Sequence, residues 1–207
     1  MSRAQQRWEE LLQLISARSY SSIQAQISAM NVLIDIGGEQ GDFAHIVEAQ
    51  GPKYCVEVQH WYSRTHEQIY PDVQYKYVTT ASLPFDSAYA DFVSIIQVLH
   101  HLDNPYETLR QIYRVLKPAG LQFIREHDCS CEEDKLTIDI EHQLYEAVLN
   151  KNMEFVSTYQ AQYFSQRYLF QIVSDAGFEL VNHSVPVGLS KGYQTLFRKK
   201  SSLNTAL

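Results

Sequence analysis

The stretch that decides the fold is NVLIDIGGEQG, residues 31–41. Its first half is a short apolar run rich in β-branched side chains, which is typical of a strand buried on both faces of a sheet. Its second half carries Gly37, Gly38 and Gly41, where the chain must turn tightly and enter a helix. Backbone N–H groups at such a turn can approach a ligand and donate hydrogen bonds to a carboxylate or a phosphate. The stretch therefore predicts a buried strand followed by a ligand-binding turn.

Strand and helix patterns alternate along the rest of the chain. Hydrophobic periodicity and turn residues predict strands over residues 31–36, 54–58, 75–79, 91–99, 121–126, 178–185 and 193–199. The same signals predict helices over residues 4–29, 40–50, 63–70, 104–117, 133–151 and 165–177. Alternating strands and helices predict an α/β fold, in which a mostly parallel sheet carries helices on both faces. Ligands of such sheets bind beyond the carboxyl ends of the strands.

Composition limits the classes of protein to which the chain can belong. The 207 residues suffice for one substantial core, so we expect a main domain over residues 31–200, a helical cap over 1–30 and a disordered tail over 201–207. The net charge of −7 and the lack of a dense Lys/Arg run disfavour a nucleic-acid partner. Three cysteines make no disulfide framework, and no apolar run is long enough for a signal or a membrane span. A cytoplasmic protein that does not enter a membrane is predicted.

Ionisable side chains follow two of the expected central strands. His100 and His101 come after the fourth strand, and Arg125–Asp128 close the fifth. Charged groups are costly to bury unless they are paired or used. The carboxyl ends of these strands lie at the edge where a parallel sheet binds its ligand, so water and ligand can solvate the cluster there.

Five stretches together resemble the class I S-adenosylmethionine-dependent methyltransferases. They occur in the order and at the intervals of that family and cover most of residues 31–185. The matching stretches are VLIDIGGEQG (32–41), Glu57 at the end of the second strand, ASLPFDSAYADFVSIIQVLHHLDNP (81–105), ETLRQIYRVLKPAGLQFI (107–124) and YFSQRYLFQIVSDAGFELV (163–181).

The resemblance implies a Rossmann-like sheet of seven strands with the last strand antiparallel, and S-adenosylmethionine as the cofactor. It places Asp35, Gly37, Gly38 and Gly41 around the methionine end of the cofactor and Glu57 on the ribose. It places Thr80, Ala81 and Ser82 near the adenine, and Ile96 and Gln97 beneath the sulfonium. Two features depart from the family pattern: Glu39 stands where a glycine is usual, with Gly38 able to take over its role, and Thr79-Thr80 replace a common acid beside the adenine.

The catalytic prediction concerns the acceptor side of the cleft. Methyl transfer from a sulfonium is an in-line displacement, and a base is needed only when the acceptor loses a proton as it attacks. Histidine is the usual base near neutral pH. We expect His100 or His127 to remove or relay that proton while Glu126 orients the histidine. The alternative is that the two histidines after the fourth strand form a turn element, with Arg125–Asp128 a structural ion-pair and capping cluster.

The sequence predicts no metal site. Cys129-Ser-Cys131 lies near His127 and His142, but this cysteine spacing is not that of a structural zinc site. The segment 132–170 is rich in aromatic residues, and in the family an insertion at this place often forms a lid over the acceptor. Aromatic residues at helical spacing are also typical of a core.

The expected function is transfer of a methyl group from S-adenosylmethionine to a small molecule or to an exposed terminal oxygen or nitrogen of a larger one. Methylation of RNA, at a cap or in tRNA, is a second interpretation. A third is a partner subunit that binds the cofactor without turnover, which the unusual Glu39 would suit. The sequence leaves the acceptor and the oligomeric state undetermined.

Overall fold

The computed structural model describes residues 3, 6, 26–27, 29–58, 70–78, 82–145, 147, 161–185 and 191–201. The strands are β1 (Leu33–Ile36), β2 (Lys53–Val58), β3 (Val73–Val78), β4 (Ala90–Ile96), β5 (Leu116–His127), β6 (Phe178–Ser184) and β7 (Gly192–Lys199). The helices are α3 (Asp42–Ile46), the short 3₁₀ turn η1 (Leu99–His101), α4 (Pro105–Val115), α5 (Glu132–Leu144) and α7 (Gln166–Asp175).

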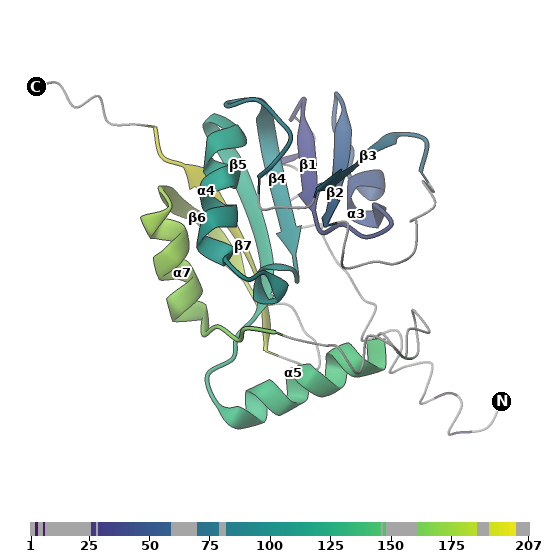
Figure 1. Cartoon of the computed structure of the whole chain (residues 1–207), viewed down its shortest axis with the longest axis vertical. Helices are drawn as coiled ribbons and strands as arrows, with labels where there is room; N and C mark the ends of the chain where they lie inside the picture. Colours follow the sequence, from purple (N-terminus) through teal and green to yellow (C-terminus); the bar gives the residue numbers. More distant parts are fainter. Residues whose placement is uncertain are drawn as a thin grey trace, which may run out of the picture.

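The strands form one sheet in the order β3-β2-β1-β4-β5-β7-β6 (Figure 1). β1 pairs in parallel with β2 and β4, and the ladders β2–β3 and β4–β5 are also parallel. β7 runs antiparallel to both of its neighbours, β5 and β6. The prediction of a seven-stranded, mostly parallel sheet with an antiparallel last strand is therefore confirmed.

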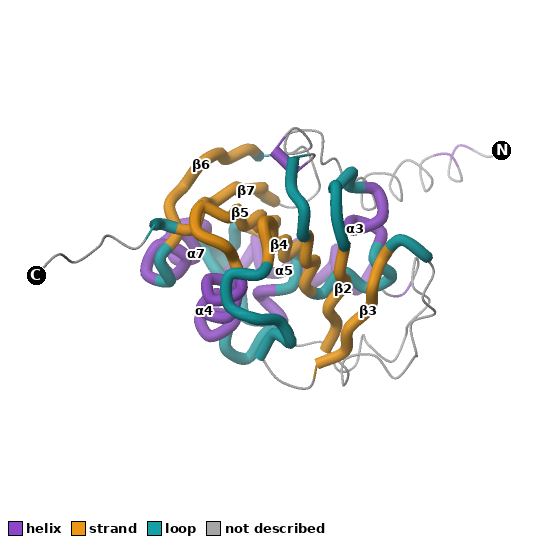
Figure 2. Tube along the Cα trace, turned by 90° about the horizontal axis from the view of Figure 1, so that it is seen from above, coloured by secondary structure: helices purple, strands orange, loops and turns teal. Residues whose placement is uncertain are grey.

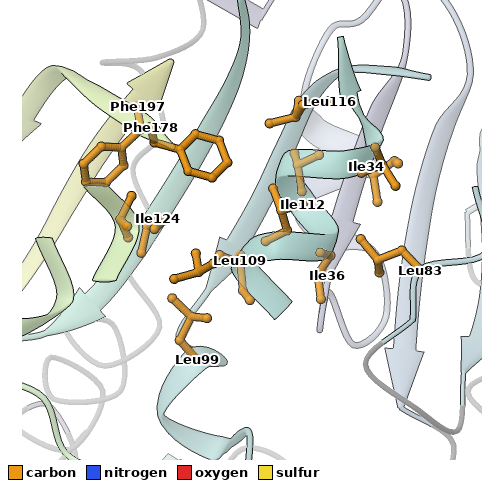
Figure 3. Packing of buried hydrophobic residues seen from close by; sticks show 14 of the residues in the cluster. Ile34, Ile36, Leu83, Leu99, Leu109, Ile112, Leu116, Ile124, Phe178 and Phe197 are labelled. Atoms are coloured by element: carbon orange, nitrogen blue, oxygen red, sulfur yellow. The ribbon is translucent and has the colours of Figure 1, made fainter. Parts of the chain in front are cut away.

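Helices cover both faces of the sheet (Figure 2). Successive side chains of a strand point to opposite faces, so β1 contributes Ile34 to one core and Leu33 to the other. The first core packs the sheet against α4 and α7 and includes Leu109 and Ile112 of α4, which Figure 3 shows between the strands and the helix. The second core packs the opposite face against Phe43 of α3. Because both faces are covered, the edge at the carboxyl ends of the strands is the place left for a ligand.

Two element boundaries differ from the predictions. The helix expected over 40–50 is limited to Asp42–Ile46, because Val47 turns to an extended backbone with φ −80° and ψ 127°. The helix expected over 104–117 has its predicted Asn104 cap, whose side chain accepts a hydrogen bond from the Glu107 N–H at 3.0 Å, but it ends at Val115.

The residues that were expected to stop this helix belong instead to an irregular start of β5. The ladder with β4 moves from the pair Ala90–Leu116 to the pair Phe92–Leu121. The intervening Lys117–Gly120 form a bulge in which Ala119 adopts a φ of 60°. Pro118 is tolerated in the strand because the bulge removes the need for its missing N–H.

Several predicted segments lie largely outside the described residues. They are the helical cap over 1–30, the helix over 63–70, the lid between residues 148 and 160, and the tail beyond residue 201. Within the part of the chain that the structure describes, no helix combines the length and the apolar character needed to cross a membrane.

Candidate functional site

The candidate site lies where the chain leaves β1, β4 and β5. Figure 1 shows α5 lying across the carboxyl ends of the central strands, with η1 between it and β4. Leu99 at the start of η1 is fully buried in the core of Figure 3 and so holds the two following histidines at this edge.

The glycines after β1 are required by space and by backbone conformation. Gly37 has a φ of +68°, and a Cβ added there would lie 2.3 Å from Cγ2 of Val98. A Cβ on Gly38 would lie 2.3 Å from Oδ2 of Asp35. Gly41 has a φ of +85°, which L residues rarely adopt. The loop is thus packed against the segment that follows β4, only two residues before His100.

Two buried carboxylates flank this loop. Asp35 is 1% exposed and accepts a hydrogen bond from the Ser94 hydroxyl at 2.6 Å. Glu57 is buried at the end of β2 and accepts a hydrogen bond from the backbone N–H of Glu39. Burial raises the pKa of the Cys55 thiol well above its usual range, and the charges of Asp35 and Glu57 raise it further. Cys55 is therefore a neutral part of the core, and the acids are the groups available to hydroxyls of a ligand.

Glu39 adopts the conformation of the glycine that it replaces. Its φ is 50°, in the left-handed region that costs an L residue about 1–2 kcal/mol. Gly38 does not take over this role, because its φ is not positive; it is needed for space beside Asp35. The role of Gly38 toward the cofactor stays a prediction.

Replacing Glu39 by glycine is expected to raise the free energy of unfolding by about 1 kcal/mol, because the left-handed backbone is then unstrained. Urea denaturation followed by circular dichroism measures the change. Ala88→Gly is the matched control, since Ala88 has a φ of 56° in a turn away from the loop. Both variants should gain stability, and a loss of stability in Glu39→Gly would contradict the strain.

The other residues predicted to hold the cofactor are partly outside the described structure. Thr80 and Ala81 lie among the residues that are not described. Ser82 is exposed and lines an open pocket together with Lys76 and Phe85. Ile96 ends β4, and the following Gln97 has a left-handed φ of 57° while its N–H donates to the carbonyl of Arg125 at 2.8 Å. Strained backbone of this kind is concentrated at functional sites.

The structure brings His100, Glu126 and His127 together. Nδ1 of His100 lies 2.7 Å from Oε2 of Glu126, and both side chains are 3% exposed. The ring of His127 lies 5.7 Å from the ring of His100, centroid to centroid. Their roles in catalysis stay predictions, but the arrangement in which the carboxylate orients His100 is present.

Two more histidines, His142 and His101, lie beside His100. Nε2 of His100 lies 3.1 Å from Nε2 of His142, which is on α5. Nδ1 of His142 bonds to the backbone carbonyl of Ile138 at 2.9 Å. The ring of His101 is 4.0 Å from that of His100 and 5.5 Å from that of His142. His100, His101, His127 and His142 are called the histidine cluster below.

Burial sets the electrostatics of the histidine cluster. It lowers the pKa of His100 well below the usual value, with His142 adding to the effect. It lowers the pKa of His127 to about 3, with smaller contributions from His100 and His142. It raises the pKa of Glu126, against the opposing influence of the histidines. Burial therefore favours the neutral imidazole at His100 and His127, and a neutral imidazole nitrogen can act as a base or bind a metal ion.

Residues 162–164, near the end of the predicted lid, contact the segments that carry the cluster. The N–H of Gln162 donates to the carbonyl of His100 at 2.6 Å, and the Tyr163 hydroxyl donates to Asp139 of α5. Phe164 accepts a backbone hydrogen bond from Cys129 and is buried in the core. This part of the predicted lid contacts both strand ends, and at Phe164 the core interpretation of the aromatic residues is the one observed.

Sequence reasoning missed His142 as a member of the site. The available signal was its position four residues after Ile138, the buried residue of α5, which places both on one helix face. The two cysteines that the sequence places near His142 have other surroundings. Cys131 is exposed, and the Cys129 thiol lies 3.8 Å from the Cys131 carbonyl.

Solved structures with the same fold include several methyltransferases. A Pyrococcus horikoshii protein matches with a TM-score of 0.65 at 15% identity, over 96% of this chain and 92% of that one. An S-adenosylmethionine-dependent methyltransferase of Thermotoga maritima matches with a TM-score of 0.61 at 21% identity, over 96% and 97%. A chain of the Haloferax volcanii complex between the Trm112 methyltransferase activator and a methyltransferase matches with a TM-score of 0.62 at 14% identity, over 97% and 95%. At these identities the likeness shows the fold.

Comparison by sequence shows the family. No curated protein matches the chain significantly. The model of a methyltransferase domain family matches residues 2–183, which is most of the chain. Family and fold agree with the glycine loop and the buried acids described above, and they imply S-adenosylmethionine as the methyl donor. The chain therefore belongs to the methyltransferase domain family.

Proposed function

We propose that the protein transfers the methyl group of S-adenosylmethionine to an oxygen or nitrogen of a small molecule, or to an exposed terminal group of a larger one. The observation that carries this proposal is the contact between the two halves of the site. The glycine loop packs on Val98, and His100 follows two residues later. A donor held by the loop would thus have its reactive end beside the histidine cluster.

The residues after β1 and β2 fit the cofactor. The space beside Gly37 and Gly38 admits no Cβ, so backbone alone can line that part of the cleft. Glu57 is buried at the place where an acid can accept hydrogen bonds from both hydroxyls of a ribose. Bound S-adenosylmethionine supplies an electrophilic methyl group on a positively charged sulfur. In this proposal Asp35, Gly37, Gly38 and Gly41 surround its methionine end, and Ile96 and Gln97 lie beneath the sulfonium.

The acceptor is proposed to sit between the loop and the histidine cluster. Its lone pair forms the new bond to the methyl carbon as the carbon–sulfur bond breaks, and the bonding electrons go to sulfur. A proton that the acceptor loses passes to His100 or His127, and Glu126 keeps the His100 ring in place through Nδ1. Holding acceptor and methyl in line supplies much of the acceleration.

Binding of the donor is tested first, with S-adenosylmethionine titrated into the full chain by calorimetry. Glu57→Ala should weaken binding by about 10–100-fold, because hydrogen bonds to a charged group contribute about 1.5–3 kcal/mol. Glu48→Ala, at an exposed glutamate in the loop between α3 and β2, is the matched control and should bind as the parent does. No binding by the parent chain would overturn the proposal.

The acceptor class is then sorted with labelled donor. The chain is incubated separately with a metabolite extract, tRNA and capped RNA, and transfer to the metabolite pool is expected. Transfer to RNA would instead support the second interpretation, which the net charge of −7 disfavours.

A partner subunit without turnover is the second candidate function. Its support is the strained Glu39 in the donor loop, together with a structural relative whose complex contains a methyltransferase activator. Donor binding with no transfer to any pool would favour it.

A cytoplasmic location stays a prediction.

A further inference from the structure

We propose that His100, His101 and His142 form a binding site for a divalent transition metal ion, with Zn²⁺ as the probe. Each of the three side chains offers a ring nitrogen, and these nitrogens all lie within 4.8 Å of one another. Zn–N bonds of about 2.0–2.1 Å at tetrahedral angles require nitrogens about 3.3 Å apart. The Nε2 atoms of His100 and His142 are already 3.1 Å apart, so a rotation of His101 would complete the triangle.

The hydrogen bonds made by Nδ1 of His100 and by Nδ1 of His142 turn the Nε2 atoms of these two rings toward the centre of the proposed site. The carbonyl of Ile138 can only accept, so Nδ1 of His142 carries the proton and Nε2 of a neutral ring carries a lone pair. Nδ1 of His100 lies 2.7 Å from Oε2 of Glu126, so Nε2 is the ring nitrogen of His100 that faces His142. The two Nε2 atoms share a hydrogen bond of 3.1 Å, and a metal ion bound between them would replace that bond.

The same contacts are those that orient histidine ligands in metal sites. A ligating histidine usually donates its second N–H to a carboxylate or a backbone carbonyl, which sets the tautomer and the ring orientation. Glu126 has this position toward His100, and the carbonyl of Ile138 has it toward His142. Imidazole nitrogens suit zinc, copper, nickel and iron rather than magnesium or calcium.

The site has the form of a catalytic metal centre more than of a structural one. Three protein ligands leave one coordination position open, whereas structural zinc sites close all four. His100 is 3% exposed, but His101 and His142 are only half-buried, so the open position can be reached from the acceptor side. With Nε2 of His100 bound to the ion, an acceptor hydroxyl in the open position would lose its proton to His127 or to water, and more readily than in solution, and would attack as the metal-bound anion. This use of the ion rests on the proposed methyl transfer; metal binding itself does not.

The sequence predicts no metal because the ligands come from η1 and α5, far apart in the chain. The nearest rival for zinc is the pair of free cysteines, Cys129 and Cys131, since thiolates bind it well. A test must therefore separate imidazole from thiol ligands.

Zinc is titrated by calorimetry into the full chain after chelator treatment and dialysis, and Co²⁺ is added in parallel to read coordination from its visible spectrum. Four variants are compared with the parent: His142→Ala, Glu126→Gln, His183→Ala and the double variant Cys129→Ser/Cys131→Ser. His183 is the matched control, a histidine of β6 that contacts Gln166 and Thr195. S-adenosylmethionine is titrated into each protein as well, which reports independently on folding and on the donor site.

One equivalent of zinc is expected to bind, with a cobalt spectrum typical of tetrahedral nitrogen ligands. His142→Ala should lose binding by at least about 100-fold, and Glu126→Gln should lose about 10–100-fold, the usual effect of a partner outside the ligand set. His183→Ala and the cysteine variant should bind as the parent does.

Two results would overturn the inference: no stoichiometric binding by the parent, or binding that survives in His142→Ala and disappears in the cysteine variant. Retained donor binding in those cases would leave the proposed methyl transfer intact. Absent donor binding with zinc still bound would overturn the proposed function and keep the metal site.

Discussion

Replacing His100 by asparagine is expected to lower turnover by about 10²–10⁴-fold while leaving the affinity for S-adenosylmethionine within a fewfold of the parent. The asparagine amide can still donate to Oε2 of Glu126, the contact that Nδ1 of His100 makes at 2.7 Å. What the variant lacks is Nε2, the atom that lies 3.1 Å from His142. Turnover is measured with labelled donor and whichever acceptor pool takes label.

Three further variants help to interpret that result. His127→Asn should also reduce turnover if His127 serves the acceptor, and His183→Ala should not. Replacing His100 by glutamine places an amide nearer the Nε2 position and gives up the contact with Glu126. If His100→Asn were as active as the parent, His100 would be a turn residue, which is the alternative that the sequence leaves open.

The second large effect is expected at Gly37. Gly37→Ala should lower the free energy of unfolding by about 2–5 kcal/mol, because it combines a left-handed backbone with a Cβ 2.3 Å from Val98. The affinity for S-adenosylmethionine should fall by at least about 100-fold, since a displacement of about 1 Å in a positioning loop can cost that much. Urea denaturation and calorimetric titration measure the two effects.

A second substitution separates the two causes. Val98→Ala removes both methyl carbons that approach the added Cβ, at 2.3 and 2.8 Å. The double variant should therefore regain the steric part, about 1–3 kcal/mol, and keep the backbone strain of about 1–2 kcal/mol. A double-mutant cycle gives the coupling. Zero coupling would mean that the loop is not packed on Val98 and that the donor loop and the histidine cluster do not share one rim.

The alternation of strands and helices was sufficient to predict the sheet. Residues 31–36 are too apolar to face water and are followed by glycine, and the mostly apolar start of 121–126 is preceded by glycine, so the type and approximate extent of both runs are local properties. The Asn104 cap is likewise local, because its acceptor and the Glu107 N–H are three residues apart. The end of that helix was not predictable in the same way, since the bulge over Lys117–Gly120 depends on pairing with β4.

Some features of the candidate site were likewise predictable from the local sequence, and others were not. The glycines after β1 are recognisable in the sequence, because a tight turn and a close backbone approach exclude other residues wherever they occur. The position of His100 and Glu126 at two strand ends was also predictable, since parallel strands end at one edge. The left-handed backbone of Glu39 was not predictable, because the free-energy cost of that conformation is offset by tertiary contacts such as the hydrogen bond from its N–H to Glu57.

The sequence by itself thus determined which elements form, which edge of the sheet carries the candidate site and which family the chain resembles. Only the tertiary structure decided that Nδ1 of His100 meets Glu126 while its Nε2 meets His142, and that α5 brings His142 close to His100 and His101. The physical reason is one of range. Periodicity, caps and turns are set by neighbours within a few residues, whereas the direction of a lone pair depends on a hydrogen bond from another element.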